Sequence, residues 1–260
     1  MISLDKKIKS LVLSHFEGVK SSAASIRTRN AQRGDLLRFT LDSGETLVVK
    51  LWKIRSMKER VKLALHISNG RREWEMHKAA HNQEINVPKP LNYQILSIPD
   101  DALYEVMTIS DLGDCISGEP FINQMKESGE NDKIASLETF IIETTLIMVK
   151  KDIFDIDNQL DNYLVDKNGG FWRIDFECAR RRYNPFQKRK DYAIMLERLL
   201  RSHLHAVHPD SKRTTSFMSR MVTELSVPKK IRKMVLKISE KELQKEKLSS
   251  NINYEISLNW

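Results

Sequence analysis

Residues 155–165 read DIDNQLDNYLV and residues 171–181 read FWRIDFECARR, and the predicted fold depends mainly on these two stretches. In the first stretch, Asp157 and Asn162 stand five residues apart, directly before a short apolar run that is typical of a strand. A glycine-containing turn, DKNGG, separates this run from a second short strand, after which Asp175 follows. The pattern predicts a β-hairpin with a carboxylate and an amide before it and a further carboxylate after it.

The part of the chain that precedes these stretches reads as antiparallel strands with one main helix inserted. Residues 56–83 are expected to be helical, with a break suggested at residues 68–70, where Ser-Asn-Gly interrupts the pattern. The sequence VPKP ends this helical stretch, because proline disfavours helix for itself and for the residue before it. Four strands are expected, over residues 36–41, 46–52, 91–96 and 103–109.

Beyond the sequence DLGD, which begins at Asp111 and reads as a hinge, the chain is predicted to be mainly helical. Helices are expected over residues 137–149, 191–205 and 213–247, the last of them basic. The predicted organisation is a helical segment (1–20), a strand-rich lobe (21–109), a helical lobe (110–248) and a polar tail (249–260).

Composition and charge limit the class of protein. The 260 residues are 40% hydrophobic and 30% charged, which fits a soluble globular protein and excludes collagen-like and wholly disordered chains. Two cysteines are too few for a disulfide framework. No apolar run reaches the ~18–20 residues that span a membrane, and charges stand where a signal peptide would be apolar. These features predict a cytoplasmic protein, and the net charge of +8 favours an anionic partner: nucleic acid, a membrane surface or a phosphorylated substrate.

Two further charged residues stand where they could serve phosphate chemistry. Lys50 ends the strand sequence LVVK, and Glu73 lies in the predicted helix before VPKP, with Glu75 as a competitor for its role. A lysine neutralises the charge that a transferring phosphoryl group spreads over its oxygens, and Mg²⁺ prefers the oxygen ligands that Asn162 and Asp175 offer. Taken singly, each of these residues more often has a purely structural role. Their order in the chain and the elements predicted to carry them favour a single site for phosphate chemistry.

In order and context, these elements resemble those of the protein-kinase-like fold. The resemblance implies a two-lobed α+β fold, with an antiparallel-sheet N-lobe that contains one main helix and a mainly helical C-lobe. It also implies that ATP and Mg²⁺ bind between the lobes: Lys50, held by Glu73, contacts the nucleotide phosphates, and Asn162 and Asp175 hold the metal. Asp157 corresponds to the aspartate that orients the acceptor hydroxyl and takes its proton.

Three departures from the pattern of this fold stand out. The sequence has no Gly-x-Gly-x-x-Gly, so the phosphate-covering loop falls on residues 28–34, where Gly34 alone supplies flexibility for nucleotide binding. Asp155 replaces a histidine of the family, and repulsion within this acidic loop is expected to raise some carboxylate pKa values, unless the loop gathers Mg²⁺ or a cationic partner. Glu177 replaces a glycine, which stiffens the segment or brings another carboxylate to the metal.

Two phrases point to one branch of this fold. WRIDFECAR and INVPKP are similar to sequences of the bacterial lipopolysaccharide kinases of the Kdo/heptose type, and the second also resembles the related RIO-type kinases. The resemblance covers roughly residues 25–200. It implies a phosphotransferase that acts on a hydroxyl of an inner-core sugar, Kdo or heptose, with an anionic glycolipid or sugar as acceptor. Such an enzyme is expected in the cytoplasm, at the inner face of the bacterial inner membrane.

Basic segments offer surfaces for an anionic partner. Residues 180–190 contain six basic and no acidic residues, with Tyr183 and Phe186 among them. They fit a solvated loop, an anion-binding surface for phosphorylated sugars or lipid head groups or, less well, RNA binding. Residues 229–247 and residues 3–16 each fit an amphipathic helix that lies on a membrane or packs on the protein.

Three alternatives to the lipopolysaccharide kinase stay open on the sequence alone. The first is a kinase of the same fold with a protein, a small molecule or a tRNA-modification complex as acceptor. The second is a non-catalytic pseudokinase that acts as a binding module, which the residues at Asp155 and Glu177 motivate. The third is a nucleic-acid-binding protein that uses the basic segments, which the ordered set of motif residues does not favour.

Overall fold

The computed structural model describes residues 4–16, 24–25, 35–98 and 102–250. By its internal contacts the chain forms two compact units, residues 1–113 and residues 114–260. Strands dominate the first unit and helices the second, and every strand pair is antiparallel, which gives the chain its α+β character. Among the helices of the described residues, none combines the length and the apolar character that crossing a bilayer requires.

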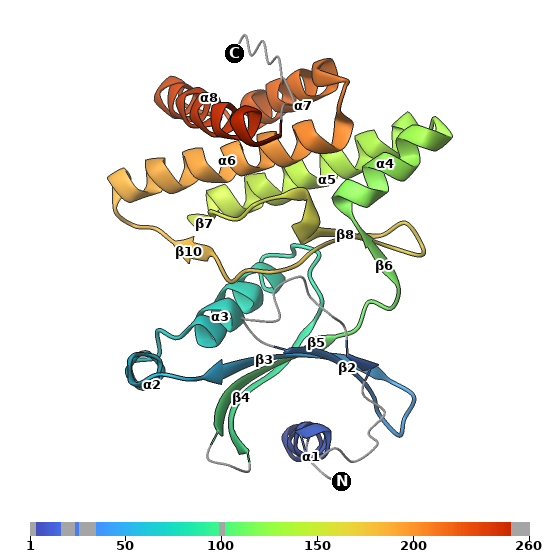
Figure 1. The fold of residues 1–260 in the computed structure, drawn as a ribbon, viewed down its shortest axis with the longest axis vertical. Coiled ribbons are helices and arrows are strands. Elements are labelled where there is room, and N and C mark those ends of the chain that lie inside the picture. Colours follow the sequence, from blue (N-terminus) through green and yellow to red (C-terminus); the bar gives the residue numbers. More distant parts are fainter. Residues whose placement is uncertain (1–3, 17–23, 26–34, 99–101, 251–260) are drawn as a thin grey trace. The chain divides into compact units, whose positions relative to one another are not determined.

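The first unit is built on a five-stranded antiparallel sheet with the strand order β1-β2-β3-β5-β4. Figure 1 labels strands β2 to β5 of this sheet. Its central strand, β3, pairs with β2 and β5 and places Lys50 opposite Leu36 and Met107. Gly44 closes the β2–β3 hairpin with a φ of 82°, in the left-handed region that glycine adopts without steric cost. All four expected strands are present, joined by a short fifth. The strands are β1 (Ala24–Ser25), β2 (Asp35–Thr40), β3 (Thr46–Ile54), β4 (Pro90–Ile98) and β5 (Ala102–Ser110).

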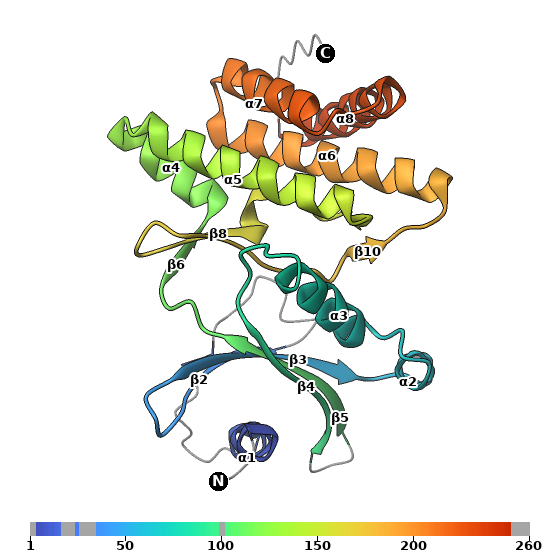
Figure 2. The same ribbon diagram turned by 180° about the vertical axis from the view of Figure 1, so that it is seen from behind.

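Helices cover both faces of this sheet (Figures 1 and 2). α1 (Leu4–Phe16) buries Ile8 and Val12 completely in a core that includes side chains of the sheet. The N-terminal amphipathic helix therefore packs on the protein, which is one of the two interpretations that its sequence allowed. α3 (Asn69–His81) lies on the opposite face and contacts β3, β4 and β5. α2 (Met57–Ala64) precedes it, so the predicted break in the helical stretch is confirmed.

The second unit is mainly helical and contains two small antiparallel sheets. One has the strand order β6-β8-β9, and the other consists of β10 and β7. The predicted hairpin is present as β8 and β9. In chain order, the elements are β6 (Cys115–Ser117), α4 (Gly118–Ser128), α5 (Asn131–Lys150), β7 (Ile153–Asp155), the 3₁₀ turn η1 (Leu160–Asn162), β8 (Tyr163–Asp166), β9 (Phe171–Arg173), β10 (Ala179–Arg181), α6 (Pro185–Val207), α7 (Ser211–Glu224) and α8 (Lys229–Ser250).

The start of α6 differs from the sequence-based expectation. The helix begins at Pro185, six residues before the expected start at Asp191. The cause is local: the Asn184 side chain accepts hydrogen bonds from the next backbone N–H groups, and proline is favoured at the first helical position. Asp191 consequently lies inside the helix, where its carboxylate pairs with Arg182.

The basic C-terminal stretch forms two helices where the sequence suggested one. α7 ends at Glu224, and Pro228 immediately precedes α8, because proline fits the start of a helix but not its interior. α8 packs against α6 and buries Ile231 and Val235. These apolar side chains therefore stabilise the second unit, which matches the interpretation of this helix as one that packs on the protein.

Candidate active site

Lys50 and Glu73 form an ion pair within the first unit. Lys50 Nζ lies 2.9 Å from Glu73 Oε1 and 2.8 Å from Oε2, so both carboxylate oxygens accept from the ammonium group. The glutamate side chain is 3% exposed and the lysine side chain 25%. Nζ also lies 5.2 Å from the centre of the Trp52 ring, within cation–π distance. The competing Glu75 is exposed and pairs with Arg71, so the structure assigns Lys50 to Glu73.

Glu105 of β5 holds the first turn of α3, the helix that carries Glu73. The Arg71 backbone N–H donates to Glu105 Oε1 at 2.8 Å, and the Ser68 hydroxyl donates to the same oxygen at 2.6 Å. The Tyr93 hydroxyl of β4 is a third donor to it. Burial and this hydrogen bond raise the pKa of Tyr93, which keeps the hydroxyl protonated. Because the first N–H groups of a helix lack partners within the helix, this buried acceptor fixes where α3 begins.

Gly70 allows α3 to lie directly on the sheet. A Cβ atom at this position would lie 2.9 Å from Glu105 Oε1 and 2.9 Å from Trp52 Cε3, which is closer than Cβ atoms approach other heavy atoms in folded proteins. The absence of a side chain therefore lets the helix approach β3 and β5. This approach sets the position of Glu73 relative to Lys50.

Asp157 and Asn162 lie in one loop of the second unit, after β7. The Asn162 side-chain amide donates to the Asp157 carbonyl oxygen at 2.6 Å, and Asn162 is buried. The Ile174 backbone N–H donates to the Asn162 carbonyl oxygen at 2.9 Å. Asp175 follows Ile174 directly, so the backbone brings the segment of Asp175 next to Asn162.

Asp155 and Arg173 form a fully buried ion pair beneath this loop, joining β7 to β9. The Arg173 guanidinium also donates to the Asn162 carbonyl oxygen at 2.9 Å. It lies 5.0 Å from the centre of the Tyr163 ring and 5.2 Å from that of Phe176. One buried cation thus connects the strand before the loop, the loop itself and the hairpin. The cationic partner of Asp155 is internal to the protein.

The expected rise of a carboxylate pKa in the acidic loop is found at Asp155, but its main cause is different. Burial raises the pKa of Asp155 to about 6, because the charged form loses its hydration. Arg173 opposes this rise, and repulsion from Asp175 and Asp157 adds only the smallest contributions. Desolvation therefore outweighs the mutual repulsion that the sequence suggested.

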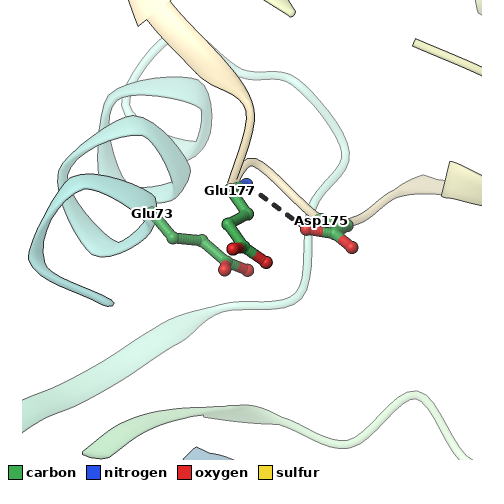
Figure 3. Close-up of side chains that lie close together, drawn as sticks. All are labelled: Glu73, Asp175 and Glu177. Carbon is green, nitrogen blue, oxygen red and sulfur yellow. Dashed lines mark hydrogen bonds between the residues drawn. The ribbon is translucent and has the colours of Figure 1, made fainter. Parts of the chain in front are cut away.

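Asp175 and Glu177 stand on the segment between β9 and β10 (Figure 3). Asp175 has a φ of 58°, in the left-handed region that aspartate tolerates better than most residues. The Glu177 backbone N–H donates to Asp175 Oδ1 at 3.3 Å, drawn as the dashed line in Figure 3. This turn follows the β8–β9 hairpin directly. Both carboxylates are half-buried.

The sequence pointed to some of these residues and not to others. Gly34 and the rest of the loop over residues 28–34 lie outside the residues that the structure describes. Reasoning from sequence missed Glu105 and Arg173. A signal was present for Arg173, since an arginine in a short strand among apolar residues needs an anionic partner. Glu105 gave none, because a single carboxylate in a strand is ordinary until its neighbours are known.

Comparison with known proteins defines the class of fold. No family model matches this sequence, and neither does any curated protein. Solved structures do match, and the two units form the protein-kinase-like fold that the sequence predicts. One of these structures is WaaP in complex with acyl carrier protein, with a TM-score of 0.59 and 17% sequence identity over 94% of this chain and 97% of that chain. At this identity the likeness concerns the fold, and the site must be argued from its own residues.

Proposed function

We propose that this protein is an ATP-dependent kinase that transfers the γ-phosphate of ATP to a hydroxyl of a lipopolysaccharide inner-core sugar, Kdo or heptose. The observation that carries the kinase proposal is the ion pair of Lys50 with Glu73. Both oxygens of a buried carboxylate hold a partly exposed ammonium group, which gives the cation a fixed position. A fixed cation stabilises developing phosphoryl charge without reorganisation during the reaction.

Each remaining residue has a role that its chemistry suits. Lys50 contacts the nucleotide phosphates, and Asp157 orients the acceptor hydroxyl and takes its proton. The amide oxygen of Asn162 and the carboxylate of Asp175 form a donor set that fits Mg²⁺, which binds few protein oxygens and keeps its waters. Bound Mg²⁺ supplies neutralisation of the phosphate charge. Arg173 is a positioning residue, since it holds the backbone of Asn162.

Two resemblances and one basic segment support the acceptor proposal. The phrases WRIDFECAR and INVPKP resemble those of lipopolysaccharide kinases, and the fold resembles that of WaaP. The basic segment at residues 180–190 exposes Tyr183 and Phe186 by 78% and 76%. We propose that this segment meets the anionic groups of the acceptor, at the cytoplasmic face of the inner membrane.

Incubation of the purified protein with γ-labelled ATP and Mg²⁺ tests the proposal. Separate reactions receive lipopolysaccharide, total bacterial protein or a small-molecule fraction. Asp157→Asn is expected to lower label transfer by about 10²–10⁴-fold, and Lys50→Met by about 10²–10³-fold. Asp161→Asn, in the same loop, and Lys53→Met, exposed on the same strand, are the matched controls and should retain transfer.

The outcomes separate the alternatives. Label in lipopolysaccharide that depends on Asp157 supports both halves of the proposal. Label that enters protein or a small molecule instead keeps the kinase and removes the sugar acceptor. An absence of Asp157-dependent label in every fraction would contradict the kinase, and titration with ATP and Mg²⁺ would then ask whether the protein is a pseudokinase.

A further inference from the structure

α2 is the one helix of the described residues that buries none of its side chains. Most helices in proteins owe their stability to an apolar face that packs on a core. α1 and α8 are the two helices whose sequences suggested an amphipathic helix that lies on a membrane, and both bury apolar residues in the protein. α2 therefore has apolar residues whose purpose the fold does not explain.

These apolar residues form a stripe along one side of the helix. Met57, Val61 and Leu65 follow one another at intervals of four residues, which places them on one face. Their exposed fractions are 76%, 52% and 62%, and Ile67, just beyond the helix, is 54% exposed. We refer to these four residues as the α2 stripe.

Local interactions hold α2 in place at both ends. At the N-terminus, Ser56 and Glu59 form a capping box: Ser56 Oγ accepts from the Glu59 N–H, and the Glu59 carboxylate accepts from the Ser56 N–H. At the C-terminus, His66 has a φ of 57°, and the Ile67 N–H bonds back to the Lys62 carbonyl at 2.9 Å. The chain thus presents the α2 stripe on a defined helix without burying it.

Positive charge borders the stripe on both sides. At 100° per residue, Lys58 and Lys62 flank it on one side and Arg60 on the other. Lys58 and Arg60 are exposed. Between residues 53 and 67, Glu59 is the one acidic residue, and its carboxylate is engaged by the backbone of the helix start.

We propose that α2 docks on an anionic phospholipid surface, with the α2 stripe inserted at the level of the head groups and the flanking basic residues on the phosphates. An apolar stripe between basic flanks is the pattern of helices that lie in a membrane interface. A specific protein interface needs about 800 Å² from each partner and some 20–30 residues, which four side chains on a short helix do not provide. Lipid contact has no such minimum, because each inserted side chain contributes separately.

Co-sedimentation with lipid vesicles tests this surface. The unmodified protein is expected to bind vesicles of phosphatidylcholine and phosphatidylglycerol and to bind pure phosphatidylcholine much more weakly. The triple variant Met57→Ser, Val61→Ser, Leu65→Ser should bind at least about tenfold more weakly. The double variant Lys58→Glu, Arg60→Glu keeps the apolar residues and should lose about tenfold or more as well. Ile95→Ser, an exposed apolar residue on β4, is the matched control and should bind like the unmodified protein.

Several results would overturn the proposal. The unmodified protein could fail to distinguish anionic from neutral vesicles, or both variants could bind as it does. If the variants keep vesicle binding but lose binding to polyglutamate, α2 recognises acidic polypeptide and not lipid. Thermal unfolding of each variant shows whether the fold is intact. The assay contains no ATP, so its result is independent of the proposed kinase activity.

Discussion

α2 and α3 are consecutive helices of the same unit, yet they are held in place by opposite means. Each follows a serine at its N-cap. Ser56 accepts from Glu59 in a capping box that lies wholly within the local sequence. Ser68 makes no such side-chain cap, and its hydroxyl donates instead to Glu105 of the sheet. α2 then buries nothing, whereas α3 buries Glu73 and three other residues.

The difference separates a helix defined by its own sequence from one defined by the sheet. Local capping fixes where α2 begins and ends but leaves its face available. Contact with Glu105 fixes where α3 lies on the sheet, and Glu73 must reach Lys50 from there. Glu73, which positions Lys50 in the proposed site, therefore stands on the helix that tertiary contacts place.

Removal of Glu105 should have the largest effect on stability, because it removes the contact that places α3 on the sheet. Glu105→Ala leaves the Ser68 hydroxyl, the Tyr93 hydroxyl and the Arg71 N–H without their acceptor, at about 1–3 kcal/mol for each buried group. We expect the free energy of unfolding to fall by about 3 kcal/mol or more, measured by urea denaturation. Amide hydrogen exchange should accelerate at the start of α3 and remain unchanged in α2.

Glu105→Gln is the control, since it keeps an oxygen at the position of the acceptor. It should restore most of the protection of α3 and most of the affinity for ATP and Mg²⁺ that Glu105→Ala loses. Equal exchange rates in α3 for Glu105→Ala and the unmodified protein would show that the helix does not depend on this contact.

Gly70→Ala is expected to lower the free energy of unfolding by less than Glu105→Ala does. The added Cβ would lie 2.9 Å from both Glu105 Oε1 and Trp52 Cε3, so the helix or its neighbours must shift. Overpacking costs about 1–3 kcal/mol, and the better helix propensity of alanine offsets up to about 1 kcal/mol. Thermal unfolding should therefore show a net loss of about 1–2 kcal/mol. Lys78→Ala, exposed on the same helix, should change stability little, and an equal loss there would remove the packing explanation.

Ser56→Ala should affect α2 alone. The variant removes one half of the capping box, an effect of about 1 kcal/mol in helices generally. Because α2 buries no residue, this loss should appear as faster hydrogen exchange within α2 and as only a slight change in the melting temperature of the protein. Faster exchange in α3 as well would mean that the two helices are coupled and that α2 is not held by its own sequence alone.

The parts of the structure that could be predicted from the sequence are those that depend on residues close together in the chain. The hairpin β8–β9 follows from its turn residues, and the break between α2 and α3 follows from Ser-Asn-Gly. Spacing and element context selected Lys50 and Glu73, which the structure joins in an ion pair. The start of α6 was missed although Asn184-Pro185 is a local signal, because the basic charge of residues 180–190 favoured a loop.

Contacts between distant strands could not be predicted in the same way. Arg173 meets Asp155 across 18 positions of sequence, and Glu105 meets Ser68 across 37. Which side chains meet depends on strand register, and register in turn depends on the whole sheet. The sequence showed an unusual carboxylate at Asp155 and an arginine among apolar residues at Arg173, but not that the two form an ion pair.

The smallest effect on stability is expected from Glu75→Gln. This variant tests which of two candidates, Glu73 or Glu75, is the partner of Lys50. Glu75 pairs with Arg71 at 2.7 Å, but both side chains are more than a third exposed, so the pair should contribute less than about 0.5 kcal/mol. The Arg71 N–H remains bonded to Glu105, so α3 should keep its position. Isothermal titration with ATP and Mg²⁺ should give an unchanged affinity for Glu75→Gln and a clearly weaker one for Glu73→Gln, because both oxygens of the buried Glu73 carboxylate accept from Lys50, whereas Glu75 pairs with Arg71. Equal weakening by the two variants would contradict the assignment of Glu73 as the partner of the lysine.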